Sequence, residues 1–291
     1  MTSYALLFLS LLVPAVVAAE GVTLRPMITA EFKADYSDLV QGGEERPVWI
    51  PVASYLIQHP QNLILFDTGF GTRIEQEIRG WWLNRLLQLI MPYRFTTEET
   101  AVEELRKNGI PPTSIKTIIL SHLHYDHTGG LRDFPKAQVI LPRAEWERAQ
   151  VGRWGGRLQG IMKEHLEGVN LWPLDYQPGT RYGPFEASYD LMGDSSVLLL
   201  STPGHTPGHQ SVLVKLGSGQ QVLLTGDAVW VEENYTRPSP KGWKARLIEE
   251  EDQEAWRTTL QIRKFHEEHP EVLIIPGHDP KILYALPAQL N

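Results

Sequence analysis

The segment from Ser121 to Gly130, SHLHYDHTGG, carries three histidines and one aspartate within six positions. In an extended backbone, side chains two positions apart point the same way, so His122 and His124 can reach one metal ion. Asp126 and His127 follow as the chain turns and can reach a second ion beside the first. A lone histidine at a strand end is usually an ordinary surface residue, but clustered imidazole and carboxylate groups are what a transition-metal site requires. We therefore interpret this segment as part of a metal site.

Three later turns each place one potential ligand just after an apolar run. His205 lies in the segment TPGHTPGH, Asp227 follows a Thr-Gly pair, and His278 follows a Pro-Gly pair. Each signal is weak alone, because such turns are common, but together they supply the ligands that the first cluster lacks. His209 and Asp279 lie beside these residues, and for both we favour packing or hydrogen bonding to a ligand over metal binding.

The composition limits both the ligands and the substrates. The 291 residues include no cysteine, which excludes thiolate nucleophiles, disulfides and cysteine-bound zinc. Any metal must therefore be held by His, Asp or Glu. The formal charge of -8 gives no basic surface for a polyanion, so we expect no nucleic-acid partner. A small neutral or amphipathic molecule fits better.

The elements that must position these residues are short strands alternating loosely with helices. Apolar, β-branched runs that predict strands span residues 62–66, 117–120, 138–141, 197–200, 211–214, 222–224 and 272–275. Helical patterns cover 97–108 and 252–269, and in the second pattern Trp256, Leu260 and Phe265 are spaced to share one face. This order predicts a layered α/β fold in which helices cover a sheet core.

Polar residues follow several predicted strands at the point where each strand ends. These are Asp67, His122, His205, Asp227 and His278. Strand ends give a rigid platform, so we expect the site to be built there.

The first 19 residues contain an apolar run from Tyr4 to Ala19 that ends in small residues, as export signals do. The run is shorter than a membrane-spanning helix and Pro14 interrupts it, which favours a cleaved signal peptide over an anchor. We predict a signal peptide at 1–19 and a single hydrolase domain at 20–291, exported to the periplasm or secreted.

The residues above resemble the metallo-β-lactamase superfamily over nearly all of the chain after residue 19. The likeness rests on the H-x-H-x-D-H pattern, the later His, Asp and His in that order, and the early LFDTG turn at Asp67. The resemblance implies an αββα sandwich of two mixed sheets flanked by helices. It also implies two divalent metal ions, expected to be zinc, with Asp67 beside the ligands. The implied ligands are His122, His124 and His205 for one ion, Asp126, His127 and His278 for the other, and Asp227 as the bridge.

Two ligand positions narrow the branch of the superfamily. Asp227 stands where zinc β-lactamases typically carry Cys or Ser, which is similar to the glyoxalase II and lactonase side. His124 stands where the redox di-iron branch has Glu, which indicates hydrolysis. The chain most resembles the N-acyl homoserine lactonases, which degrade quorum-sensing signals. The implied reaction is attack of a metal-bridging hydroxide on the lactone carbonyl, with Asp126 delivering a proton to the leaving oxygen.

One position departs from that branch. The lactonases generally carry a tyrosine three residues past the bridging aspartate, whereas this chain has Trp230. An indole N–H can donate a hydrogen bond but lacks the acidity of a phenol. Tyr235 can substitute only if the loop folds back, so both residues are candidate substrate contacts. Other ester, thioester or β-lactam hydrolysis stays an alternative, as does a non-catalytic binding protein stabilised by its metals.

Residues 78–93 form an aromatic and aliphatic segment, IRGWWLNRLLQLIMPY. As a functional segment it would be a lid or channel wall for an acyl chain, or a surface that docks on a membrane. As a structural segment it would be a core-packing helix or an interface for self-association. The sequence leaves both interpretations open.

Overall fold

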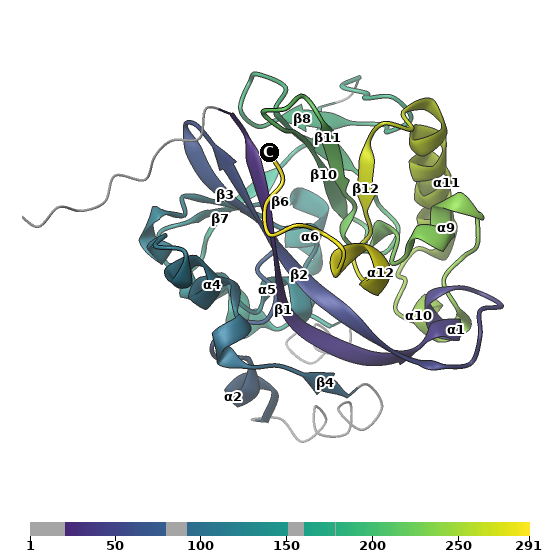
Figure 1. Cartoon of the computed structure of the whole chain (residues 1–291), viewed down its shortest axis with the longest axis horizontal. Coiled ribbons are helices and arrows are strands. Elements are labelled where there is room, and N and C mark those ends of the chain that lie inside the picture. The colour runs from purple at the N-terminus through teal and green to yellow at the C-terminus, as the bar shows by residue number, and fades with distance from the viewer. Residues whose placement is uncertain (1–20, 80–91, 151–159, 178) are drawn as a thin grey trace, which may run out of the picture.

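The computed structural model describes residues 21–79, 92–150, 160–177 and 179–291. In it, two β-sheets pack against each other and helices lie outside them (Figure 1). The predicted signal peptide and residues 80–91 of the aromatic segment lie outside the described residues, so both interpretations stay predictions. Across the described ranges, no helix has both the length and the apolar character needed to cross a membrane.

The first sheet has seven strands in the order β4-β1-β2-β3-β5-β6-β7. Their bounds are β1 (Thr23–Asp35), β2 (Pro47–His59), β3 (Asn62–Phe66), β4 (Tyr93–Arg94), β5 (Thr117–Ile119), β6 (Gln138–Pro142) and β7 (Asn170–Leu174). Strands β1 to β3 pair antiparallel, and β3, β5, β6 and β7 pair parallel, so the sheet is mixed.

The second sheet has five strands in the order β12-β11-β10-β9-β8. Their bounds are β8 (Ser188–Asp190), β9 (Val197–Ser201), β10 (Gln210–Lys215), β11 (Gln221–Leu224) and β12 (Leu273–Ile275). Only the β11–β12 pair is parallel, and the other pairs are antiparallel. The strands predicted from apolar runs are all present, with ends shifted by one residue at most.

The helical elements connect these strands. They are α1 (Tyr36–Leu39), α2 (Ile74–Arg79), η1 (Thr97–Glu99), α4 (Ala101–Lys107), η2 (Pro112–Ser114), α5 (Tyr125–Thr128), η3 (Leu131–Asp133), α6 (Arg143–Arg148), α8 (Lys163–Leu166), η4 (Gly226–Ala228), α9 (Glu232–Thr236), α10 (Trp243–Arg246), α11 (Asp252–Glu268) and α12 (Pro280–Leu283). The predicted helix at 97–108 is present as η1 followed by α4.

The main core lies between the sheets, because alternate residues of each strand point inward. Ile64 and Ile119 of the first sheet belong to one buried cluster with Val212 and Leu224 of the second. The intervening residues of the first sheet pack with α4, and those of the second sheet pack with α11. The predicted sandwich of two mixed sheets flanked by helices is therefore confirmed.

The buried face of α11 differs from the expected one. Thr258, Ile262 and Phe265 are buried, whereas Leu260 is 41% exposed. Residues two apart in a helix lie on nearly opposite sides, so Leu260 cannot share the face of Ile262. The prediction that Trp256, Leu260 and Phe265 form one buried face was wrong. The hydroxyls of two threonines on the true face bond to backbone carbonyls, which lets those residues be buried.

Candidate metal centre

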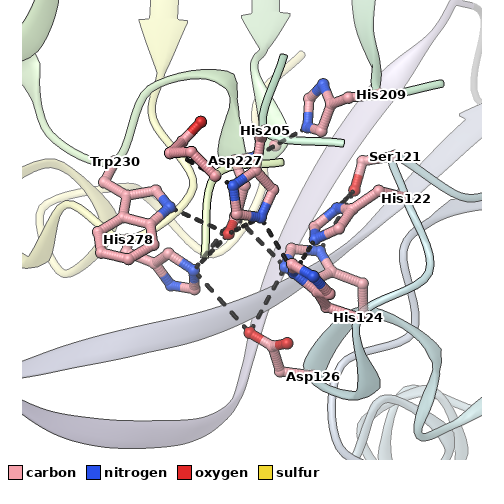
Figure 2. Close-up of polar contacts among 12 residues, drawn as sticks. Ser121, His122, His124, Asp126, His205, His209, Asp227, Trp230 and His278 are labelled. Carbon is pink, nitrogen blue, oxygen red and sulfur yellow. Dashed lines mark hydrogen bonds and ion pairs between the residues drawn. The ribbon is translucent and has the colours of Figure 1, made fainter. Parts of the chain in front are cut away.

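The seven predicted ligands converge where strands of both sheets end (Figure 2). The first sheet supplies the loop and short helix α5 that follow β5, and the second sheet supplies the turns after β9, β11 and β12. The ligands from the first sheet are His122, His124, Asp126 and His127, and those from the second are His205, Asp227 and His278. All seven are buried, and each of the two clusters draws ligands from both sheets.

Three ring nitrogens of the first cluster face one another. His124 Nδ1 lies 2.9 Å from His122 Nε2 and 3.0 Å from His205 Nε2. Asp227 Oδ2 completes the cluster at 3.4 Å from His205 Nε2. Four tetrahedral ligands of zinc, each ~2.0–2.1 Å from the ion, lie about 3.3 Å from one another. The spacing of these atoms therefore fits a single ion among them.

The second cluster pairs two histidines with a carboxylate. Asp126 Oδ2 lies 3.5 Å from His127 Nε2 and 3.9 Å from His278 Nε2. Asp227 Oδ1 approaches the same two nitrogens, at 3.3 Å and 3.2 Å. Asp227 Oδ2 lies near His205 of the first cluster and Oδ1 near His127 of the second, while His278 Nε2 is within 3.3 Å of both oxygens. Asp227 therefore lies between the two clusters, where a bridging carboxylate is required.

Two buried polar atoms of this centre indicate that cations fit between the ligands. His127 Nε2 and Asp227 Oδ1 are buried and lie 3.3 Å apart, but neither makes a hydrogen bond of suitable geometry within the described part of the chain. Buried polar atoms in proteins almost always have a partner, so such atoms call for an unseen one. Imidazole nitrogen and carboxylate oxygen are ligands that divalent transition metals accept. The donor set therefore fits two divalent ions.

The charges around the ligands agree with metal binding. Burial, helped by neighbouring histidines, lowers the pKa of His122 and His124 well below the usual range. Both rings are therefore neutral, which is the form that binds a metal. Burial alone would lower the pKa of His127 as well, but nearby carboxylates, Asp126 first among them, raise it well above the usual range. A metal ion at this ring would replace the proton that the carboxylates favour.

The outer nitrogens of two ligands are held by oxygen atoms. Asp67 Oδ2 lies 2.7 Å from His127 Nδ1, and its other oxygen accepts the backbone N–H of Ser121 at 2.7 Å. His278 Nδ1 lies 2.8 Å from the carbonyl oxygen of Pro51. Such contacts fix the ring so that its other nitrogen faces the ion. Asp67 thus lies where the resemblance predicts, beside a ligand.

His209 and Asp279 do not join either cluster. His209 Nδ1 lies 2.9 Å from Thr202 Oγ1, and its Nε2 accepts the backbone N–H of Asp227 at 3.0 Å. Asp279 caps α12 by accepting the N–H of Lys281 at 2.9 Å. Hydrogen bonding and capping therefore account for both residues.

The two candidate substrate contacts have different surroundings. Trp230 Nε1 donates a 3.0 Å hydrogen bond to Asp227 Oδ2, and its ring stands edge-on to His278. Tyr235 is 3% exposed and packs in the apolar cluster of α11, with its ring 5.2 Å from that of His266. A substrate contact by Tyr235 would require the segment after Asp227 to fold back toward the metal centre. It does not, because α9 holds the Tyr235 side chain in the core. Burial raises the pKa of this phenol well above its usual value.

Helix α6 contributes residues that sequence reasoning missed. The buried Glu145 accepts the N–H of Leu123 at 3.2 Å and that of Gly208 at 3.1 Å, so it joins the two ligand loops. Arg148 Nη2 lies 3.4 Å from His124 Nε2. The local sequence, RAEWER, reads as an ordinary charged helix. Only the packing of this helix against both loops identifies the role of these residues.

Gly226 directly precedes the bridging ligand and adopts a φ of +52°. A Cβ at this position would lie 2.8 Å from the Ser121 Cβ and 2.9 Å from His209 Nε2. We expect Gly226→Ala to lower the free energy of unfolding by about 2 kcal/mol or more, because strain and crowding add. Gly42→Ala is the matched control, since Gly42 has a φ of +76° with open space around it. Its loss should be roughly 1 kcal/mol. Equal losses in urea unfolding would contradict the crowding argument.

A sandwich of two mixed sheets with paired His and Asp clusters at the shared strand ends defines a dinuclear metallohydrolase. The family model described as the metallo-beta-lactamase superfamily matches residues 47–278. The chain belongs to this superfamily, as its motifs predicted.

Several similar proteins are N-acyl homoserine lactonases. The N-acyl homoserine lactonase AttM of Rhizobium radiobacter is 30% identical over an alignment of 237 residues that covers 79% of this chain and 82% of that protein. An N-acyl homoserine lactonase of a Bacillus species is 34% identical over 192 residues, covering 66% and 69%. A solved N-acyl homoserine lactone hydrolase with N-hexanoyl-L-homoserine at its catalytic metal centre matches with a TM-score of 0.72 at 25% identity, covering 91% and 96%. The predicted resemblance to these lactonases is thus confirmed.

Proposed function

We propose that this protein is a metal-dependent hydrolase that opens the lactone ring of N-acyl homoserine lactones. The observation that carries the proposal is the bridging position of Asp227 between two complete ligand clusters. The similar proteins named for this reaction support the choice of substrate. Bound divalent ions would supply a water of lowered pKa and a Lewis acid for the carbonyl oxygen. We propose zinc for both ions, because imidazole and carboxylate ligands without thiolates suit it.

Asp126 is placed to move a proton during this reaction. Its side chain is 12% exposed, against 4% for Asp227, so it is the more accessible of the two carboxylates. One oxygen faces the histidines of the second cluster, and Figure 2 shows the other turned away from the His278 contact. A carboxylate with one free oxygen can hold a proton and pass it to the leaving alkoxide. We assign Asp126 this role.

Trp230 orients the bridging carboxylate in this proposal and does not contact the substrate. Its single N–H is donated to Asp227 Oδ2. An indole has no second donor, so binding a lactone carbonyl would require this bond to break. In this chain, the residue at the position where similar lactonases carry tyrosine therefore hydrogen-bonds to the bridging ligand.

Tyr125, the neighbour of Asp126, is partly exposed and is backed by two buried phenylalanine rings. The partly exposed Tyr125 packs edge-on to Phe32, with ring centroids 6.0 Å apart, and lies 6.0 Å from Phe70. Ligand sites in proteins are mostly apolar with a few polar groups that fix orientation. We propose that the N-acyl chain packs against the exposed part of Tyr125 while the lactone faces the metal centre.

The proposal is tested by a substrate panel on the purified, zinc-loaded protein. N-hexanoyl homoserine lactone, S-lactoylglutathione and a chromogenic cephalosporin are assayed side by side, and metal content is measured on the same sample. We expect kcat/KM for the lactone to exceed the other two by about 10²-fold or more, since the discrimination comes from contacts in the pocket.

Each other outcome of the panel points to a different function. Preference for the thioester or the cephalosporin would replace the lactone by that substrate class. Two bound ions per chain without turnover of any substrate would instead indicate a binding protein that is stabilised by its metals. The assay therefore separates the lactonase from both alternatives.

A further inference from the structure

Four consecutive acidic residues, Glu249 to Asp252, lead into α11, which begins at Asp252. Such a run normally lies in solvent, and the side chain of Asp252 is 47% exposed. The side chain of Glu249 is only 2% exposed, so one member of the run turns into the protein. A carboxylate is rarely buried unless it is paired, which makes its partners informative.

The segment around Glu249 contacts one metal ligand twice. Glu249 Oε1 lies 3.3 Å from His205 Nδ1, on the side of the ring away from the first cluster. The next residue, Glu250, donates its backbone N–H to the carbonyl oxygen of His205 at 3.1 Å. Both the ring and the backbone of His205 are therefore held by residues that follow α10.

Lys241, at the other end of α10, holds Glu249 in place. Its ammonium group pairs with Glu249 Oε1 and donates a 2.6 Å hydrogen bond to the backbone carbonyl of Asp227. The Lys241 side chain is 7% exposed and lies over the ring of Trp230, 4.8 Å from the ring centroid. The buried ion pair thus stands behind two ligands of the same cluster.

We propose that Glu249, held by Lys241, is a positioning residue that sets the affinity of the first cluster for its metal ion. Glu249 accepts the Nδ1–H of His205 and fixes the ring with Nε2 toward the ion. A carboxylate behind a metal-binding histidine also makes the imidazole a stronger donor. The inference rests on the proposed dinuclear centre, and it adds to that centre two residues that are not metal ligands.

The test compares zinc affinities of the full-length chain, measured by competition with chelators of graded strength. Glu249→Gln keeps the shape and an acceptor oxygen but loses the charge, so we expect affinity for one of the two ions to fall about 10-fold. The other ion should bind as in the wild type. Glu251→Gln is the matched control, because it removes an exposed carboxylate two positions away and should leave both affinities unchanged.

Glu249→Gln leaves the buried Lys241 without a charged partner, which could prevent folding. A second variant covers that case. Replacing Lys241 and Glu249 together by methionine removes the ion pair as a unit, which buried pairs often tolerate. Here the acceptor itself is lost, and we expect a fall of about 100-fold at one ion. A merely structural role would lower the stability of the metal-free protein and leave zinc affinity unchanged.

The outcomes separate this inference from the proposed function. Wild-type affinity for both ions in the folded Glu249→Gln and double-methionine variants would overturn the inference. Two bound ions in the wild type without lactone hydrolysis would overturn the proposed substrate only, because zinc binding is measured without substrate. A wild-type chain that binds no zinc would overturn both.

Discussion

Asp126→Asn is expected to lower kcat/KM for lactone opening by ~10²–10⁴-fold, the usual contribution of a proton-transfer group, while both metal ions stay bound. Asparagine keeps one oxygen that can face the second cluster, as Asp126 Oδ2 does at 3.5 Å from His127 Nε2. It cannot take up a proton and pass it to the leaving oxygen. The rate should therefore fall without loss of metal.

Three measurements on one preparation check this result: steady-state kinetics, metal content and circular dichroism. Asp175→Asn serves as the control, because it removes an exposed carboxylate that pairs with Arg143 at the surface. Full turnover by Asp126→Asn with both ions present would show that the proton moves by another route.

Asp227→Asn is expected to lower the metal content to one ion or fewer per chain and to reduce kcat/KM by about 10³-fold or more. Asp227 places one oxygen near His205 of the first cluster and the other near His127 of the second, whereas an amide offers one acceptor oxygen and an NH₂ group that repels cations. The loss of one negative charge between two divalent ions weakens the binding of both.

The fold should survive this substitution, because the hydrogen bonds of the residue 227 backbone stay in place when its side chain changes. Its N–H is bonded to His209 and its carbonyl oxygen to Lys241. Metal analysis after dialysis, with the Asp175→Asn protein treated in parallel, gives the measurement. Retention of two ions at wild-type affinity would show that the bridge is dispensable.

Much of this centre could be predicted because its signals are local. Short apolar runs ended by turn residues mark strands, and ligands placed directly after them must gather at strand ends. The spacing of His122 and His124 predicted their shared metal site, and their facing nitrogens lie 2.9 Å apart. The carboxylate at Asp227 distinguished the glyoxalase II and lactonase side of the superfamily from the zinc β-lactamases.

The remainder depends on contacts that only the folded chain makes. Strands β1 and β2 gave no clean apolar run, because Pro26 interrupts the first and Pro51 the second. Proline is tolerated in β1 because its outer edge pairs with β4 only around Phe32. Glu145 and Glu249 lie far along the sequence from the residues that they hold, so no local pattern marks them.

The origin of the ligands has a consequence for stability. Each cluster takes ligands from both sheets, so an ion bound there would cross-link the two halves of the sandwich. The chain has no cysteine and can form no disulfide, so bound metal ions would provide a cross-link of the kind that a disulfide gives other proteins. Part of the free energy of metal binding is then free energy of folding. Removing the metal would therefore lower the stability of the packing between the sheets as well as abolish activity.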